Sequence, residues 1–202
     1  MKLLDTPAYA VAGESNARET GWALRALTAL YIETGDEKYK AKCDRIVGYF
    51  EKWYDDYGCF AAPYTDNTLI HVGFMISVAV GSLMRYYRIN KTDELKELIM
   101  LAVDDILDNC MLDCGLFYYK ELPSLARLGN NTLLLEAMAA GYELTGDKRY
   151  LEAGLATMRR ALMEPHKYVG GDKQIIGDAL VVAGDSTKNF AQSFYPIAYY
   201  YK

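Results

Sequence analysis

A repeat of about 56 residues constrains the fold of this chain more than any other feature. Three segments align on a tyrosine that is followed eight positions later by a large apolar side chain. The tyrosines are Tyr31, Tyr87 and Tyr142, and the spacing between neighbours is almost constant. A second pattern, Asp-x-Gly-x-Phe, occurs at 56–60 and again at 113–117. Two patterns with nearly one period indicate a tandem structural unit rather than a chance match.

Each unit has the pattern of two helices joined by a tight turn. Apolar residues recur three and four positions apart on both sides of the turn, which is the spacing of one helix face. Two of the three turns read Thr-Gly-Asp. We expect Gly35 and Gly146 to end the first helix of a unit in the left-handed conformation. We expect Asp36 and Asp147 to cap the second helix through their carboxylates.

The two helices of a unit differ in composition. The helices before the turns are rich in small and apolar residues such as Ala23, Ala26 and Ala29, whereas the helices after the turns carry more charge. A helix that is apolar over most of its surface is buried, and a helix with a charged face borders solvent. We therefore expect an inner and an outer layer of helices.

The repeat resembles the hairpin of six-hairpin glycosidase-like (α/α) toroids. The resemblance rests on Leu-Tyr-x-x-Thr-Gly-Asp-x-x-Tyr at 30–39, followed by an outer helix and the Asp-x-Gly-x-Phe pattern. The segment that runs from Arg18 to Trp22 also resembles the start of an inner helix in that superfamily. Glycoside hydrolases, polysaccharide lyases, epimerases and non-catalytic domains share this hairpin, so the resemblance implies a ring of inner helices inside a ring of outer helices.

The repeat also predicts how many helices the chain contains. The period places a fourth tyrosine near Tyr199. We predict an all-α fold of antiparallel helical hairpins from an (α/α) toroid, with about seven helices, three hairpins plus one. Family toroids close with more hairpins, which implies an incomplete ring in a single domain over residues 1–202. An open arc would expose apolar inner-helix surface, so we expect either a homodimer or the remainder of a larger chain to cover it.

The composition disfavours several classes of partner. The net charge of −5 and the sequence pI near 5.1 provide no concentrated basic surface, so we expect no nucleic acid. No apolar stretch reaches the roughly 20 residues that cross a bilayer, so we expect no membrane partner. The first five residues do not begin a signal peptide. We expect a cytoplasmic location, or an extracytoplasmic one if the sequence lacks an original signal peptide.

The four cysteines form neither a disulfide framework nor a zinc site. Cys110 and Cys114 are four positions apart, but no second pair of Cys or His completes a set of four ligands. The sequence also lacks a phosphate-binding loop and a G-x-S-x-G motif. We therefore expect no metal and no cofactor.

The toroid resemblance implies that a functional site lies at the mouth, the end of the ring where the inner helices begin. Helix N-termini converge there, and their free N–H groups attract polar ligand groups. The candidate catalytic carboxylates at these positions are Asp66, Glu19 and Glu14. The candidate substrate-binding residues are His71, Arg18, Asn67, Tyr64, Asn130, Asp185 and Trp53.

Glycosidic cleavage usually needs two carboxyl groups, one as general acid and one as base or nucleophile. Glu14 or Glu19, paired with Asp66, would supply these groups from adjacent hairpins, and Asp185 is a third candidate. The aromatic side chains between residues 53 and 64 would stack on sugar faces.

Each candidate also has a structural interpretation. Short polar residues such as Asp66, Asn67, Asn130 and Asp185 serve equally well as helix N-caps. A carboxylate at Glu19 is favoured in a first helical turn without any ligand. His71 is a hydrogen-bonded core residue unless charged partners surround it, and the aromatic rings pack loops onto helix ends.

Two functions from different classes fit these observations. A carbohydrate-active, glycoside hydrolase-like toroid domain would bind an oligosaccharide or another small-molecule substrate at its mouth. A non-catalytic helical-repeat scaffold or protein-interaction domain would need no catalytic groups. The polar and aromatic segments at one end of the hairpins favour the first function, and the sequence leaves open whether the chain is an enzyme.

Overall fold

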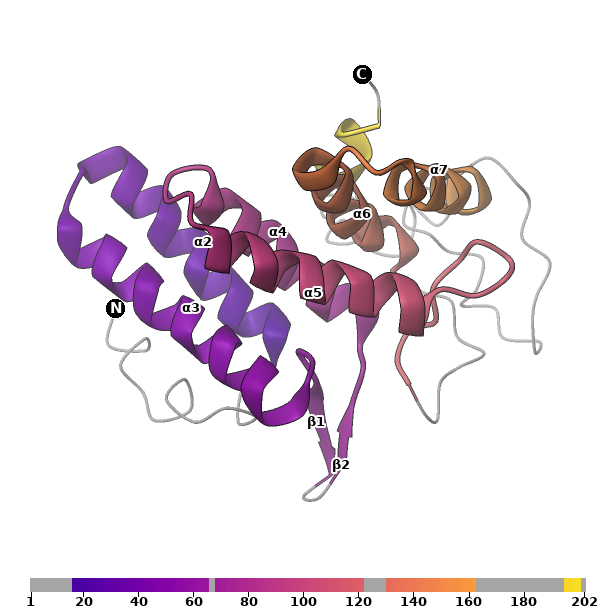
Figure 1. The fold of residues 1–202 in the computed structure, drawn as a ribbon, viewed down its shortest axis with the longest axis horizontal. Helices are drawn as coiled ribbons and strands as arrows, with labels where there is room; N and C mark the ends of the chain where they lie inside the picture. Colours follow the sequence, from indigo (N-terminus) through magenta and orange to yellow (C-terminus); the bar gives the residue numbers. More distant parts are fainter. Residues whose placement is uncertain (1–15, 66–67, 122–129, 163–194, 201–202) are drawn as a thin grey trace, which may run out of the picture.

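The computed structural model of the chain describes residues 16–65, 68–121, 130–162 and 195–200 (Figure 1). Three antiparallel helical hairpins follow one another along these residues, as the repeat predicts. Their helices are α2 (Ala17–Thr34), α3 (Glu37–Tyr57), α4 (Gly73–Tyr87), α5 (Asp93–Cys110), α6 (Asn131–Thr145) and α7 (Lys148–Leu162). A short helical turn at 195–198 follows in the last described segment. No described helix is long and apolar enough to cross a bilayer.

The turns inside the first and third hairpins confirm the predicted capping. Gly35 has a φ of 63° and its N–H donates to the Tyr31 carbonyl at 2.8 Å. The Asp36 carboxylate then accepts from the Lys38 N–H at 3.0 Å and opens α3. The third hairpin repeats this arrangement, with the Asp147 carboxylate accepting from the Arg149 N–H at 2.9 Å. Because these bonds join residues that are close together in the chain, the local sequence alone specifies them.

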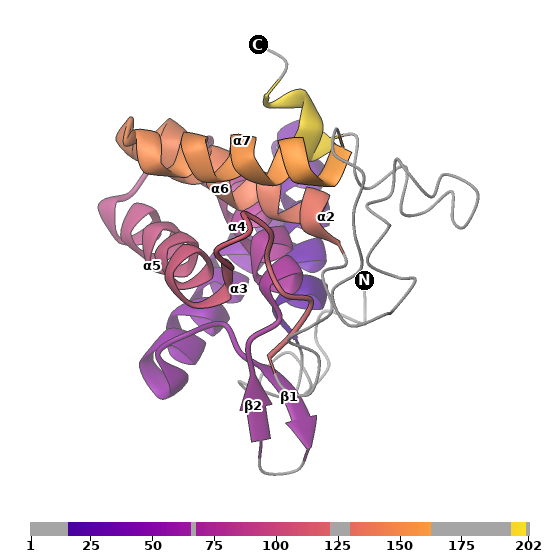
Figure 2. The ribbon, with the colours of Figure 1, turned by 90° about the vertical axis from the view of Figure 1, so that its right-hand side faces the viewer.

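The helices lie in the two predicted layers. Twelve of the fifteen residues of α4 are buried, whereas α3 buries five of its 21. The inner helices α2, α4 and α6 pack side by side, and α3, α5 and α7 cover them from outside. Figures 1 and 2 show this order, with the hairpins stacked along the molecule. The core therefore lies between the layers, as the composition of the helices predicts.

Small residues allow the inner helices to approach closely. A Cβ on Gly21 of α2 would lie 2.9 Å from the Cα of Ala79 in α4, so only glycine fits this contact. Between α4 and α6, the buried Ser77 hydroxyl donates to the Leu133 carbonyl at 2.6 Å and accepts from the Ala137 N–H at 3.1 Å. Ser77 thus bonds to two groups one turn apart on α6 and fixes the two helices against each other.

A buried ion pair connects the first and third inner helices. Arg25 Nη2 of α2 lies 3.0 Å from Glu136 Oε1 of α6, and the Glu136 side chain is 5% exposed. Gly81 lies between them on α4, at the corresponding position of the repeat, and a Cβ there would be 2.0 Å from the Glu136 carboxyl carbon. Burial raises the pKa of Glu136, and the charge of Arg25 opposes that rise. The missing side chain at Gly81 therefore makes room for a charged contact across α4.

The helical turn at 195–198 lies where the repeat predicts the fourth inner helix. Arg88 Nη2 of α4 lies 2.8 Å from Glu143 Oε2 of α6 and donates to the Tyr199 hydroxyl at 3.4 Å. Arg88 and Glu143 directly follow the repeat tyrosines Tyr87 and Tyr142, and Tyr199 lies near the place where the period puts the fourth tyrosine. The Tyr200 hydroxyl also donates to the Leu135 carbonyl at 3.3 Å. These contacts place the end of the chain beside α6, where the period predicts the next inner helix.

The segment between the first and second hairpins adds two short strands to the predicted helical fold. It contains a two-stranded antiparallel sheet, β1 (Ala62–Thr65) and β2 (Thr68–Ile70), in which Ala62 pairs with Ile70. Thr and Ile favour extended backbone, but the strands are too short for an alternating pattern to be visible in the sequence. Figure 2 shows this β-hairpin projecting from one end of the helical layers.

Candidate functional site

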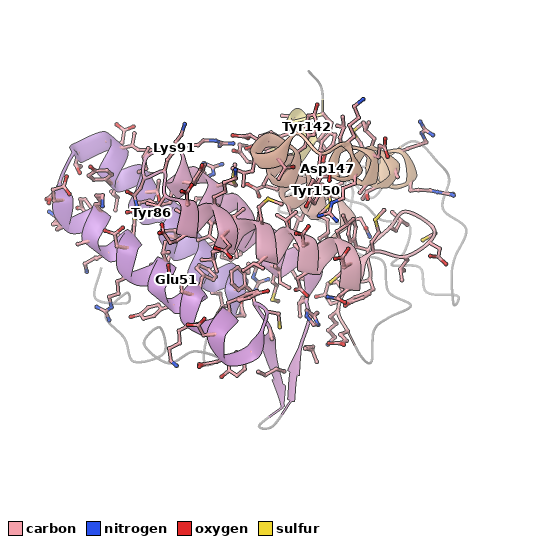
Figure 3. The ribbon with its side chains drawn as sticks, in the orientation of Figure 1. Glu51, Tyr86, Lys91, Tyr142, Asp147 and Tyr150 are labelled. Carbon is pink, nitrogen blue, oxygen red and sulfur yellow. The ribbon has the colours of Figure 1, made fainter. Side chains whose placement is uncertain are left out.

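The two ends of the molecule differ in what they carry. Figure 3 labels Lys91 and Asp147 at the turns inside the second and third hairpins, away from the β-hairpin. The opposite end, which we call the mouth, holds the N-termini of the inner helices, the C-termini of α3 and α5, and the β-hairpin. The segments that connect successive hairpins are long enough to carry side-chain clusters, whereas the turns inside the hairpins are short.

The central polar cluster of the mouth is built around His71, which lies between β2 and α4. Its Nε2 is 3.2 Å from Asp105 Oδ1 in α5, and its Nδ1 is 3.2 Å from Glu121 Oε2 in the segment after α5. The His71 N–H also donates to Glu121 Oε2 at 3.1 Å, and the Glu121 N–H donates to the His71 carbonyl at 2.9 Å. Backbone and side chain together therefore hold Glu121 at a fixed place beside the ring.

The carboxylates favour the charged form of this histidine. The hydrogen bond to Asp105, followed by one to the Cys59 sulfur, raises the pKa of His71 to about 11 against the opposing effect of burial. The ring is thus an imidazolium at neutral pH and donates from both nitrogens. The Asp105 side chain is 9% exposed, and its Oδ2 is buried with no hydrogen-bond partner among the described residues. The Glu121 side chain is 41% exposed and reaches solvent.

Aromatic rings and one arginine form a second group at the mouth. The Arg18 guanidinium, in the first turn of α2, lies 5.0 Å from the ring centre of Trp22 and 5.9 Å from that of Phe74. Phe74, in the first turn of α4, stacks on Tyr119 with ring centres 5.3 Å apart and an angle of 24° between the planes. Because Phe74 is close to His71 in the chain and Tyr119 is close to Glu121, the aromatic group adjoins the polar cluster.

Comparisons with known proteins show which fold the helices around the site share with a solved structure. No family model and no curated protein matches the chain. Among solved structures, the chain is similar to a GH76 alpha-mannanase from Bacteroides thetaiotaomicron, with a TM-score of 0.58 and 16% sequence identity. The described hairpins have the (α/α) toroid fold. The match covers 72% of this chain and 44% of the mannanase chain, so the toroid segment spans less than half of that protein.

The structure places four of the predicted site residues on the toroid mouth or near it. Arg18 and His71 belong to the two groups described above. Glu19 has an exposed side chain 3.6 Å from Arg18, and its N–H is capped by Asn16 at 3.0 Å. Asn130 precedes α6 with a φ of 64° and makes no side-chain capping bond. The Asn130 side chain therefore does not cap α6. A ligand role for Arg18, His71, Glu19 and Asn130 stays a prediction.

Of the remaining predicted residues, one lies in the core and the others lie wholly or partly outside the described residues. Trp53 is 2% exposed and packs edge to face against Phe50, with ring centres 5.7 Å apart. This position favours the packing interpretation of Trp53 over sugar stacking, because neither ring face reaches solvent. Tyr64 lies on β1, but its side chain is outside the described part. Residues Glu14, Asp66, Asn67 and Asp185 also lie outside the described residues, so the pairing of Glu14 or Glu19 with Asp66 stays a prediction.

Asp105, Glu121, Phe74 and Trp22 were not predicted from the sequence as members of the site. Asp105 and Glu121 surround His71, Phe74 stacks on Tyr119, and Trp22 lies beside Arg18. Asp105 and Glu121 both lie far from His71 in the chain, and no local pattern connects the three residues. One signal was present, since His71 was expected to mark a site only if charged partners surrounded it. No cluster of three or more His, Cys, Asp or Glu suited to a metal ion occurs among the described residues.

The arrangement at the mouth provides specific chemical groups. The stacked Phe74–Tyr119 pair adjoins solvent through the half-buried Tyr119. Glu121 adds a solvent-reaching carboxylate oriented by His71, and Asp105 adds a second, nearly buried one. Phe74 itself is 5% exposed, so Tyr119 is the ring of the pair that reaches solvent. A partly exposed ring beside oriented carboxylates suits a ligand with apolar C–H faces and many hydroxyl groups.

Proposed function

We propose that the chain is a carbohydrate-active toroid domain that binds an oligosaccharide at its mouth. The observation that carries the proposal is the placement of a charged Asp105–His71–Glu121 cluster beside the stacked Phe74–Tyr119 pair. A sugar ring presents C–H groups on its faces and hydroxyl groups at its edge. The partly exposed Tyr119 ring, backed by Phe74, matches a sugar face. Carboxylates and arginine match the hydroxyl edge through charge-assisted hydrogen bonds.

The charges at the mouth favour a neutral sugar over an acidic one. In the two groups described above, Arg18 and His71 supply two positive charges, whereas Glu19, Asp105 and Glu121 supply three negative charges. These carboxylates would repel the acidic groups of a polyanionic ligand. The similar solved structure is an alpha-mannanase, which directs the choice to mannose-containing oligosaccharides.

Glu121 is the best-placed described residue for a role in glycosidic cleavage. Such cleavage usually needs two carboxyl groups, one of them reaching the glycosidic oxygen. Glu121 reaches solvent and is held by His71 from both the ring and the backbone. Glu19 is a second exposed carboxylate at the mouth, and Asp66 is the second group predicted from the sequence. We infer that Glu121 acts at the bond and that His71 positions it.

The first experiment measures the melting temperature of the 202-residue chain with a panel of oligosaccharides. The panel contains alpha-linked mannose oligosaccharides, neutral glucans and uronate-containing oligosaccharides. A ligand that binds only the folded state at 100 times its Kd stabilises that state by about 2.7 kcal/mol. We expect a rise in Tm with neutral, mannose-containing ligands and none with uronates. No rise with any glycan would favour the scaffold function instead.

A substitution then tests the role of Glu121. Glu121→Gln keeps the size and hydrogen-bonding capacity of the side chain but removes its charge, so we expect the ligand-induced rise in Tm to remain while reducing-end release falls by about 100-fold or more. Glu51→Gln is the matched control, because Glu51 is an exposed glutamate on α3 outside the site (Figure 3). Equal cleavage by Glu121→Gln and the wild type would exclude Glu121 as the acting group.

A further inference from the structure

Successive inner helices contact each other through the same two faces. We use the term rear face for the positions of an inner helix that pack against the preceding inner helix. On α4, the Arg25 side chain of α2 donates to the Ser82 hydroxyl at 3.2 Å and to the Val78 carbonyl at 3.5 Å. On α6, Ser77 of α4 bonds to the backbone groups of Leu133 and Ala137. Leu133 and Ala137 repeat the positions of Val78 and Ser82 one unit later, so the same repeat positions make both contacts.

The rear faces of α4 and α6 are buried along their length. Ser82 and Ala137 are both fully buried, and Val78 and Leu133 are 6% and 9% exposed. One helical turn further on, Tyr86 of α4 is 1% exposed and the equivalent Gly141 of α6 is also buried. Tyr86 bonds to Asp44 of α3, and a Cβ on Gly141 would lie 2.9 Å from Val103 of α5. The middle of the rear face is therefore buried against the preceding inner helix, and its far end against the outer helix of the same preceding hairpin.

The equivalent face of α2 is exposed. Trp22, Ala26 and Leu30 hold the positions of Val78, Ser82 and Tyr86 one unit earlier in the repeat. The Trp22 and Leu30 side chains are 37% and 38% exposed, and Ala26 is also exposed. Ala29 and Glu33 are also exposed, but their α4 equivalents Arg85 and Ile89 are not buried, so they lie outside this surface. We call the group Trp22, Ala26 and Leu30 the α2 rear face, an apolar surface whose equivalent positions are buried on both α4 and α6.

We propose that a second copy of this chain packs on the α2 rear face and continues the stack of inner helices. The surface repeats the positions through which α4 and α6 receive an inner helix, so the fitting partner is an inner helix of the same repeat. The small side chain of Ala26 allows a helix to approach closely. The proposal does not rest on the proposed function, although Trp22 also lies beside Arg18 of the mouth.

The size of the surface sets the expected strength of the dimer. A helix of 18 residues such as α2 is about 27 Å long, so one face of it buries roughly 300 Å². Stable complexes bury about 800 Å² per partner, which places the dimer in the weak, concentration-dependent class. We therefore expect a dissociation constant in the micromolar range or above.

Sedimentation velocity of the 202-residue chain from about 1 µM to about 1 mM tests the proposal. We expect the mass to rise from the monomer value of 22.8 kDa toward twice that value as the concentration increases. Because Trp53 is buried and Trp22 is exposed, a shift of tryptophan emission to shorter wavelength with concentration would report burial of Trp22. A monomer at every concentration would overturn the proposal. The α2 rear face would then have to be covered by another part of this chain or by a different protein.

Matched substitutions locate the contact. Leu30→Glu places a charge in the α2 rear face, and we expect at least a tenfold increase in the dissociation constant. Leu155→Glu is the control, because Leu155 is 40% exposed on α7 and lies outside this face. Both variants should keep the wild-type urea midpoint, which shows that the fold is intact. A dimer that persists in Leu30→Glu, or that is weakened equally by Leu155→Glu, would contradict the proposal.

Discussion

At the scale of single residues, one glycine allows an ion pair to form between the inner helices. Arg25 and Glu136 come from helices that are not neighbours in the stack, and they meet because Gly81 has no side chain. A buried ion pair of this kind adds little compared with apolar packing, but the loss of one partner leaves the other charge unpaired. The pair therefore constrains the sequence more strongly than it stabilises the fold.

Arg25→Met should lower the free energy of unfolding by about 3 kcal/mol near neutral pH, because the ionised Glu136 loses its partner in a buried place. Burial already raises the pKa of Glu136, and removal of Arg25 raises it further. The folded variant then binds more protons than the unfolded chain, so its stability falls as pH rises. Urea denaturation at about pH 5 and about pH 8 should show the larger loss at the higher pH.

The double variant Arg25→Met/Glu136→Met serves as the control for this pH dependence. It removes both charges, so we expect it to be within about 1 kcal/mol of the wild type at both pH values. A single Arg25→Met variant whose loss of stability is the same at both pH values would show that Glu136 does not carry the effect.

His71 gives a second pH dependence of known sign. The contact with Asp105 raises the pKa of His71 from 6.5 to about 11 in the folded state. The resulting stabilisation is fully present below about pH 6.5 and is lost progressively as pH rises toward 11. His71→Gln should therefore cost about 2 kcal/mol at about pH 6 and much less at about pH 10. Urea midpoints of both proteins across this range measure the difference, and a constant difference would refute the charged His71.

At the scale of elements, close packing of α2 on α4 depends on one glycine. A Cβ at position 21 would meet the Ala79 Cα, which is a backbone atom and cannot rotate away. Gly48 in α3 has no atom within 4 Å of the place where its Cβ would be. The two glycines thus lie in helices of the same hairpin, but only Gly21 is required by a contact.

Gly21→Ala and Gly48→Ala should change stability in opposite directions. Alanine favours a helix over glycine by about 1 kcal/mol, and this gain should appear undiminished in Gly48→Ala. In Gly21→Ala the overpacking against α4, which costs about 1–3 kcal/mol, should exceed the gain. The Tm of each variant, measured by thermal unfolding, gives the sign of its stability change. A higher Tm for both variants would show that α2 and α4 can move apart without cost.

At the scale of the whole molecule, the period of the sequence was sufficient to predict three hairpins in two layers. It was sufficient because the turns are local and the helix faces repeat every unit. The mouth was harder to predict, because His71 meets Asp105 and Glu121 only after α5 has folded back along α4. Arg25 and Glu136 hold equivalent positions in the first and third hairpins, but the repeat alone does not indicate that their side chains meet across α4. Sequence therefore predicts the scaffold well and the side-chain clusters poorly.

The burial of α4 predicts the most stable part of the molecule. Because α4 lies between α2 and α6 and is covered by α5, its backbone should open only with the whole fold. We expect its amides to exchange more slowly than those of α3 and α7, which each face solvent on one side. Native-state hydrogen exchange measured by mass spectrometry checks this order. Equal protection of all the described helices would indicate that the hairpins unfold as one unit.

The difference between the two ends of the hairpins bears on how a chain of this kind can diversify. The Gly35–Asp36 and Gly146–Asp147 turns have no spare residue, since each one ends a helix and caps the next. One inserted residue there would rotate the following helix by about 100° and turn its apolar face away from its neighbours. The segments between hairpins hold the β-hairpin and the mouth residues, and a change of length there leaves every helix in register. Under the proposed function, insertions and deletions at the mouth would change ligand specificity without rotating any helix.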